Sequence, residues 1–252
     1  MELVVLGAGT PYPRPDRACS GYLLRADDIR VWVDAGPGTL ANLQRHVRPD
    51  QLSAIWLSHT HADHTADLLS AYYALAFADL SPTAPIPVLG PPGWAERMEA
   101  FLASGEPNPM SRVFEVHELH DGHEVTLGGL RLTSRAVEHG LPAFGLRAEH
   151  GGHSLAYSGD TGPCPALDDL ARDADLLLCE ADSSTWPSDE PRWHCTPEDA
   201  GATARRAGVG RLVVTHVGPS LSPEEATRRA RTAFGGPTHC AHEGDVYSPS
   251  GT

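Results

Sequence analysis

The densest group of metal-binding residue types lies in the segment from Ser58 to His64. It reads Ser-His-Thr-His-Ala-Asp-His, so three imidazoles and one carboxylate fall within six residues. Imidazole and carboxylate together favour Zn²⁺ or a similar first-row ion. Because alternate residues of an extended segment point the same way, His59 and His61 can converge on one ion. Asp63 and His64 then face a second position beside it.

Three further residues of this type, His139, Asp160 and His216, each come after a predicted β-strand. Taken singly, each has an ordinary explanation, since an Asp before Thr-Gly is often a turn former. Taken together, the three residues are predicted to be additional metal ligands, because the ends of strands hold side chains rigidly.

The elements expected to position these groups alternate between strands and helices in both halves of the chain. Predicted strands cover residues 2–6, 21–24, 30–34, 54–57, 86–89, 113–117, 125–127, 130–138, 144–147, 154–158, 176–180 and 211–215. Predicted helices cover residues 37–46, 64–80, 94–102 (ending near Gly105), 167–173, 197–207 and 223–234. This order predicts an α/β protein with two face-to-face sheets and helices outside, in one domain over residues 1–252.

Composition narrows the function classes. The chain has 252 residues, of which 19 are basic (all arginine) and 33 acidic, so the formal net charge is −14. This balance argues against binding nucleic acid through a broad basic surface. No stretch approaches the length of a membrane span, and nothing at the start resembles a signal peptide. Five widely spaced cysteines without a CxxC pair predict free thiols and a cytoplasmic location.

The ordered set His-x-His-x-Asp-His, followed by His139, Asp160 and His216, resembles the metallo-β-lactamase superfamily over essentially the whole chain. The resemblance implies a four-layer αββα sandwich with a site for two divalent ions at one edge of the sheets. Zn²⁺ is the expected ion, with Mn²⁺ or Fe²⁺ as alternatives. The implied ligands are His59, His61 and His139 for the first ion and Asp63, His64 and His216 for the second, with Asp160 bridging.

Two other matching positions are Asp34, in Val-Trp-Val-Asp-Ala-Gly, and the glycine loop from Gly7 to Pro13. We expect Asp34 to orient a ligand or the histidine loop, with a strand-ending turn residue as the alternative.

Glu180 and the later His194, just before a predicted helix, resemble a pair found in the ribonuclease Z-like phosphodiesterases. A histidine close to a helix N-terminus can help to handle a phosphate. The alternative is a solvated loop residue beside Trp193.

A closer resemblance is to the atypical class II-like cyclic-nucleotide phosphodiesterases of actinobacterial type. It rests on residues 20–26, 43–46, 144–147, 154–162, 178–181 and 212–216. It implies hydrolysis of 3′,5′-cyclic nucleotides, cyclic AMP above all, to nucleoside monophosphates. In the mechanism we hypothesise, a hydroxide between the two ions attacks phosphorus and Asp63 orients it or accepts its proton. His194, steered by Glu180, then protonates the leaving oxygen.

Other functions remain to be weighed. A metal-dependent acyl hydrolase (lactonase, thioesterase or β-lactamase-like) would use the same ions but gives Glu180 and His194 no particular role. Ribonuclease Z-like RNA processing fits less well, because residues 79–112 carry few basic side chains. A non-enzymatic protein is disfavoured, because every ligand position is filled. The expected partner is a small phosphodiester, with no extended nucleic acid and no membrane, and the resemblance suggests a homodimer.

Several residues have no clear place in this scheme. We expect the remaining histidines to lie on the surface or in turns, although two of them could line the pocket. They include His117, His120 and His123, near a predicted turn, and His239 and His242, near the end of the chain. Arg147 could meet a phosphate or form a structural salt bridge.

Overall fold

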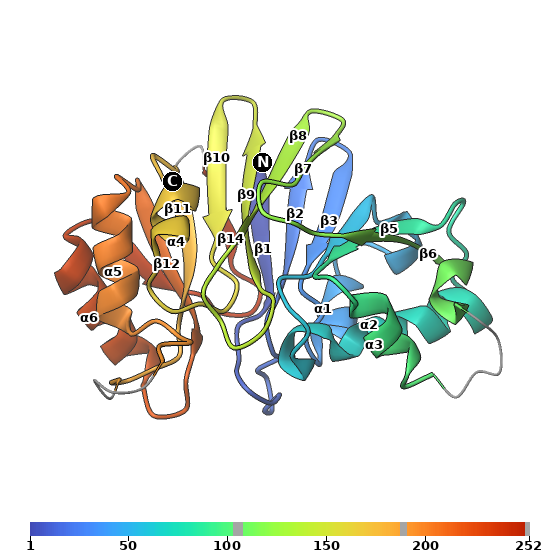
Figure 1. Ribbon diagram of the computed structural model, residues 1–252, viewed down its shortest axis with the longest axis horizontal. Helices are drawn as coiled ribbons and strands as arrows, with labels where there is room; N and C mark the ends of the chain where they lie inside the picture. Colours follow the sequence, from blue (N-terminus) through green and yellow to red (C-terminus); the bar gives the residue numbers. More distant parts are fainter. Residues whose placement is uncertain (103–107, 187–190, 250–252) are drawn as a thin grey trace.

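The computed structural model describes residues 1–102, 108–186 and 191–249, and their strands form two seven-stranded sheets (Figure 1). The first sheet has the order β14-β1-β2-β3-β4-β5-β6 and the second β13-β12-β11-β10-β9-β8-β7. The strands of the first are β1 (Glu2–Gly7), β2 (Gly21–Ala26), β3 (Ile29–Val33), β4 (Ala54–Trp56), β5 (Ile86–Gly90), β6 (Phe114–Glu118) and β14 (Val246–Tyr247). Those of the second are β7 (Glu124–Leu127), β8 (Leu130–Ala136), β9 (Phe144–His150), β10 (His153–Tyr157), β11 (Leu176–Ala181), β12 (Arg211–Val217) and β13 (Thr238–Cys240).

Both sheets are mixed. In the first, β1, β2 and β3 pair antiparallel, and β3 to β6 pair parallel. In the second, β7 to β10 pair antiparallel, and β10 to β13 pair parallel. The parallel strands therefore bring several carboxyl ends to the same edge, where loops can carry functional side chains.

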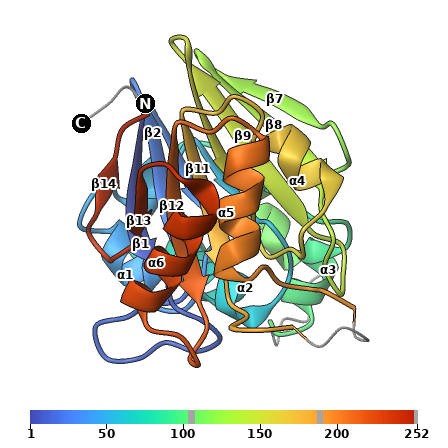
Figure 2. The same ribbon diagram turned by 90° about the vertical axis from the view of Figure 1, so that its left-hand side faces the viewer.

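Helices flank the two sheets on opposite sides (Figures 1 and 2). The helices of the first half are α1 (Thr39–Leu43), α2 (Ala62–Phe77) and α3 (Trp94–Glu99), with 3₁₀ turns at Pro49–Gln51 and Pro109–Arg112. Those of the second half are α4 (Pro165–Leu170), α5 (Pro197–Arg206) and α6 (Pro223–Phe234). Figure 2 shows α5 and α6 in front of β11 and β12.

The fold has four layers, helices, sheet, sheet and helices, and a hydrophobic cluster lies between each layer and the next. In β1, Val4 belongs to the cluster beneath α2, whereas Leu3 and Val5 belong to the cluster between the sheets. In β11, Leu177 faces the cluster beneath α5, and Leu178 faces the cluster between the sheets. Successive residues of a strand point to opposite faces, so sheets covered on both sides need such nearly continuous apolar strands. The expected αββα sandwich is confirmed.

Several predicted boundaries were wrong. The helix expected over 37–46 is only α1, because Gly38 adopts the left-handed conformation (φ 95°) and the chain turns after Leu43. The helices expected over 64–80 and 167–173 are displaced toward their N-termini, to α2 and α4. The strand expected to reach Glu138 ends at Ala136, and Gly105 lies outside the described residues.

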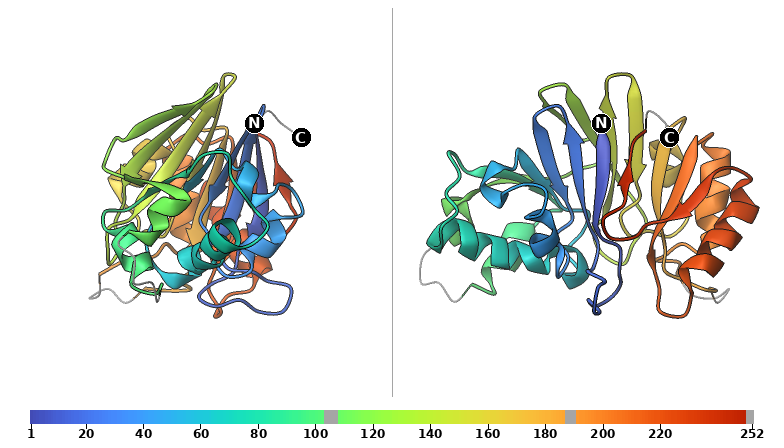
Figure 3. Two further views of the ribbon diagram at one scale, coloured as in Figure 1. Left: turned by 90° about the vertical axis from the view of Figure 1, so that its right-hand side faces the viewer. Right: turned by 180° about the vertical axis from the view of Figure 1, so that it is seen from behind.

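Two strands near the chain end were not predicted. β13 and β14 have three and two residues, too few to show a periodic pattern. β14 pairs with β1, and the right panel of Figure 3 shows it in red beside the N-terminal strand.

All five cysteines are free thiols. Within the described residues, no helix combines the length and the apolar character needed to cross a membrane.

Candidate metal centre

The histidine loop begins where β4 ends and runs into the first turn of α2. It is anchored by Asp34, which is fully buried directly after β3 and adopts a left-handed backbone (φ 56°). Asp34 accepts hydrogen bonds from Ser58 N (2.7 Å), Ser58 Oγ (2.8 Å), His64 Nδ1 (2.8 Å) and Tyr157 Oη (2.7 Å). The carboxylate thus fixes both ends of the loop, in the orienting position expected for it.

The second sheet brings three residues to this loop from the ends of separate strands. His139 follows β8, Asp160 follows β10 and His216 lies within the last residues of β12. Glu180 pairs with Thr215, but the next pair is Ala181 with Val217, so His216 is an extra, bulged residue with φ 49°. Such bulges turn a side chain away from the regular alternation, which here directs His216 to the site.

These side chains gather into two adjoining groups. Within each group, the potential ligand atoms lie within 4.8 Å of one another. The first group is His59, His61, His139 and Asp160, and the second is Asp63, His64 and His216. Asp160 Oδ2 lies 3.5 Å from both His59 Nε2 and His216 Nε2, so it stands between the groups. The structure therefore brings together every residue predicted as a ligand, and their individual roles stay predictions.

Hydrogen bonds on the outside of the cluster fix how several imidazoles present their nitrogens. Ser58 Oγ donates to Asp34, so His59 Nδ1 donates to Ser58 Oγ (2.9 Å), and His139 Nδ1 donates to the Trp193 carbonyl (2.9 Å). The Nε2 lone pairs of both rings therefore face His61 Nδ1, at 3.1 and 3.3 Å. A proton on His61 Nδ1 can satisfy only one of these two lone pairs, whereas a cation between the three nitrogens would satisfy both.

Two buried atoms without hydrogen-bond partners also indicate a cation site. Among the described residues, His64 Nε2 and Asp160 Oδ1 are buried without a hydrogen-bond partner, although only 3.2 Å separates them. Buried polar groups normally have partners, and a cation between these two atoms would satisfy both of them. A nitrogen and oxygen donor set of this kind fits a divalent cation.

The two groups differ in their electrostatics. Burial lowers the pKa of His59, His61 and His139, which favours the neutral imidazoles that bind metal ions. Burial also opposes charge on His64 and His216, but Asp160 and its neighbouring carboxylates outweigh it and raise the pKa of both. Burial would raise the pKa of Asp160, yet the surrounding histidines hold it well below its usual range.

The predicted pair of Glu180 and His194 is formed. His194 Nδ1 donates to Glu180 Oε1 at 2.8 Å, and the fully buried Glu180 also accepts from Thr161 N (2.9 Å) and Asp182 N (3.0 Å). Burial lowers the pKa of His194, but the hydrogen bond and charge of Glu180 outweigh burial and raise the pKa to about 9. Burial raises the pKa of the Glu180 carboxyl, and the bond from His194 opposes that rise. His194 is therefore bound to a buried carboxylate beside the ligand cluster, not free in a solvated loop.

A cavity of about 560 Å³ opens onto these residues. Its walls also include five residues that had no predicted role of their own: Thr10, Pro11, Ala62, Asp182 and Pro219. Thr10 Oγ1 donates to Asp63 Oδ2 at 3.5 Å. The resemblance had marked the glycine loop around Thr10 but not its contact with Asp63, which depends on residues far apart in the sequence.

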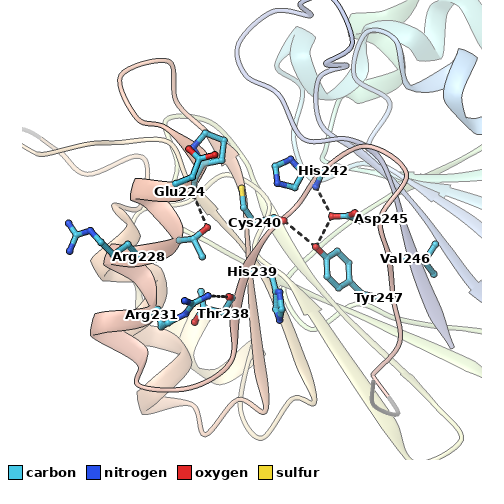
Figure 4. A pocket seen from close by; sticks show the side chains of 12 residues that line it. Glu224, Arg228, Arg231, Thr238, His239, Cys240, His242, Asp245, Val246 and Tyr247 are labelled. Atoms are coloured by element: carbon cyan, nitrogen blue, oxygen red, sulfur yellow. Dashed lines mark hydrogen bonds between the residues drawn. The ribbon is translucent and has the colours of Figure 1, made fainter.

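The remaining histidines lie elsewhere. His239 and His242 line a different cavity of about 610 Å³ between α6, β13 and β14 (Figure 4). Two of the polar side chains there bond to other residues of the lining, since Arg231 donates to the Thr238 carbonyl and Tyr247 to Asp245. The rings of His120 and His123 stack at 4.6 Å in a turn, and His117 lies 3.2 Å from Glu115.

Arg147 has a structural role. It donates to the carbonyls of Leu170 (2.9 Å) and Arg172 (2.8 Å) and pairs with Glu149 (3.2 Å). These bonds tie β9 to the end of α4, so the salt-bridge alternative for Arg147 holds.

Comparison with known proteins places this fold and site in a family. The family described as "Beta-lactamase superfamily domain" matches residues 29–217, so the chain belongs to the metallo-β-lactamase superfamily. A similar curated sequence is the uncharacterized protein Rv1339 of Mycobacterium tuberculosis (strain ATCC 25618 / H37Rv), 39% identical over 95% of this chain and 89% of that protein. Ribonuclease Z of Mycobacterium bovis (strain BCG / Pasteur 1173P2) is 36% identical over 94% of each chain.

A solved structure agrees over nearly the whole chain. The metallo-β-lactamase fold protein YhfI from Bacillus subtilis superposes with a TM-score of 0.84 at 25% identity, covering 98% of this chain and 99% of that one. The protein is thus a member of a metal-dependent hydrolase superfamily with ribonuclease Z among its relatives.

Proposed function

We propose that this protein is a phosphodiesterase that uses two divalent cations to hydrolyse small 3′,5′-cyclic nucleotides, with cyclic AMP favoured, to nucleoside monophosphates. The observation that carries the proposal is the pair formed by buried Glu180 and partly exposed His194 beside the ligand cluster. The ring centroid of His194 lies 5.1 Å from that of His139 and 5.9 Å from that of His216. An imidazolium at this place can donate a proton to a leaving alkoxide.

The residues that would hold the first cation are His59, His61 and His139, and Asp63, His64 and His216 would hold the second, with Asp160 between them. Zn²⁺ suits this nitrogen-rich set, and Mn²⁺ and Fe²⁺ are alternatives. When bound, such cations supply Lewis acidity that activates water and neutralises the non-bridging phosphate oxygens.

The chain's own residues supply the proton transfers in the proposed mechanism. Asp63 Oδ2 orients the attacking water and accepts its proton, while Thr10 Oγ1, 3.5 Å away, donates to that oxygen and helps to fix its position. His194 protonates the leaving oxygen, and Glu180 keeps the imidazole in one orientation through Nδ1. Separate acid and base groups on opposite sides of a phosphorus atom suit in-line displacement.

The size and charge of the site support a small substrate. The cavity of about 560 Å³ is in the range of small-molecule sites. The formal net charge of −14 opposes binding of an extended polyanion. The free thiols support a reducing, cytoplasmic location.

Processing of RNA is a second candidate, favoured by the 36% identity to a protein named ribonuclease Z. Among the described residues of the 79–112 interval, the only basic side chains are Arg97 and Arg112. Residues 103–107 of this interval lie outside the described part of the chain.

The test is an assay panel on purified protein of known metal content. It compares cyclic AMP, cyclic GMP, a chromogenic phosphodiester, precursor tRNA and a chromogenic lactone, each with and without chelator. We expect chelator-sensitive turnover of the cyclic nucleotides. Lactone turnover without phosphodiester turnover would reject the proposal, and tRNA cleavage alone would favour the second candidate.

His194→Ala sharpens the same test. Because His194 acts on the leaving group in this mechanism, turnover should fall by about 10²–10⁴-fold while the protein keeps its metal content. His242→Ala, in the other cavity, is the matched control and should change neither quantity. Turnover of His194→Ala near that of the unmodified protein would remove His194 from the mechanism.

A further inference from the structure

His216 is the least supported imidazole of the cluster. Its Nε2 lies 3.4 Å from Asp63 Oδ2 and 3.5 Å from Asp160 Oδ2, so this nitrogen faces the ligand cluster. Its Nδ1 is buried and has no hydrogen-bond partner. The residue also occupies a bulge with a left-handed backbone, so the regular strand alternation does not define where its side chain points.

The outer nitrogens of the other Nε2-facing imidazoles are all held. His59 Nδ1 donates to Ser58, His64 Nδ1 to Asp34, and His139 Nδ1 to the Trp193 carbonyl, each within 2.9 Å. A metal-binding histidine generally needs such a partner, which fixes the ring and makes the inner nitrogen more basic. His216 Nδ1 has no such hydrogen bond, but an acceptor lies just beyond hydrogen-bond distance from it.

That acceptor is Asp182. Its Oδ1 lies 3.8 Å from His216 Nδ1, and its side chain is 26% exposed, on the wall of the catalytic cavity. The backbone of Asp182 is fixed by its N–H, which donates to Glu180 Oε2 at 3.0 Å. Close approach is possible because the facing residue is Gly218, where a Cβ would lie 2.1 Å from the Asp182 carbonyl oxygen and 2.9 Å from Oδ1.

We propose that Asp182 is a positioning residue that accepts the Nδ1 proton of His216 and so presents His216 Nε2 to the second cation. The Asp182 carboxyl group is partly exposed, and a small side-chain movement would shorten the 3.8 Å separation to hydrogen-bond length. The inference rests on the metal binding proposed above, but it does not depend on the identity of the substrate.

The experiment measures zinc binding without substrate, by competition with a chromogenic chelator at fixed pH, for the intact protein, Asp182→Ala and Asp182→Asn. Asp182→Ala should bind the second equivalent of zinc about 10–100-fold more weakly. The first equivalent should be unaffected, because Asp182 contacts none of its histidines. Asp182→Asn keeps a carbonyl acceptor and should fall between the two. Asp28→Ala, an exposed position in the β2–β3 turn, is the control.

Each alternative result has a distinct meaning. Unchanged zinc affinity in Asp182→Ala, with a raised KM for the cyclic nucleotide, would overturn the inference and make Asp182 a substrate contact. Equal weakening of both equivalents, or equal weakening in the Ala and Asn variants, would also overturn it. An intact protein that bound only one equivalent would overturn the two-cation site itself, and the inference with it.

Discussion

The loop from Ser58 to His64 carries four candidate ligands within six residues, whereas the second sheet supplies its ligands singly, from the ends of separate strands. One buried carboxylate, Asp34, organises the loop through three hydrogen bonds and accepts a fourth from Tyr157 of the second sheet. The second sheet has a buried carboxylate of its own, Glu180, but this accepts from Thr161 N, Asp182 N and His194 Nδ1 and from none of the predicted ligands. Its ligands depend on a bulge at His216 and on close backbone contacts between segments distant in sequence. The first sheet contributes a local motif, and the second contributes a tertiary arrangement.

Removing the organiser of the loop should have the largest effect. Asp34→Ala leaves the donors of Ser58, His64 and Tyr157 without a buried acceptor, so the free energy of unfolding should fall by about 3–5 kcal/mol. Zinc binding should weaken as well, because His64 loses its outer partner. Chemical denaturation and zinc titration measure the two effects.

The control for this substitution is Asp173→Ala. Asp173 is an exposed aspartate with φ 51°, so its replacement measures the cost of alanine in the left-handed conformation alone. A loss in Asp34→Ala no larger than in Asp173→Ala would mean that the hydrogen bonds of Asp34 do not organise the loop.

The same contrast explains what the sequence could and could not predict. The spacing of His59, His61, Asp63 and His64 is visible in one short segment, and its position after a buried strand needs only local patterns. His139, Asp160 and His216 were singled out by the predicted strand ends and by family resemblance. The bulge was not predictable, because an extra residue in β12 shows only in its pairing with β11.

The role inferred for Asp182 shows the limit most clearly. Its acceptor position depends on His216, which is distant along the chain, and on a facing glycine that lets the two strands approach. Neither appears as a spacing motif. The overall sandwich was easier to predict from the sequence, because buried strands and amphipathic helices alternate along the chain in the order that layered sheets require.

Gly162→Ala tests the tertiary arrangement of the second sheet. A Cβ at Gly162 would lie 1.9 Å from the Arg192 carbonyl oxygen, so the backbone segment that carries His194 must move. A displacement of about 1 Å can cost up to about 10²-fold in rate, and we expect turnover to fall by about 10-fold to 10²-fold at matched metal content. Steady-state kinetics with metal-quantified protein measure it.

Gly140→Ala is the matched control, because its Cβ would meet Trp193 at 4.0 Å, an ordinary contact with a side chain in the same segment. Full activity in both variants would show that the segment tolerates displacement. Turnover would then depend less on the exact position of His194 than the close contacts of the second sheet suggest.

The smallest effect should come from the helix that follows His194. Thr196 caps α5, since its Oγ1 accepts from Asp199 N at 3.2 Å and its N–H donates to Asp199 Oδ2 at 2.9 Å. Thr196→Ala should lower the free energy of unfolding by about 1 kcal/mol, or Tm by about 2–4 °C. Turnover should hardly change, because His194 is oriented by Glu180 and not by the cap. Ser222→Ala removes the equivalent bond at α6 and should match it in stability. If Thr196→Ala lost tenfold more turnover than Ser222→Ala, the cap itself would belong to the arrangement that positions His194, and the helix N-terminus would join the strand ends as a determinant of the site.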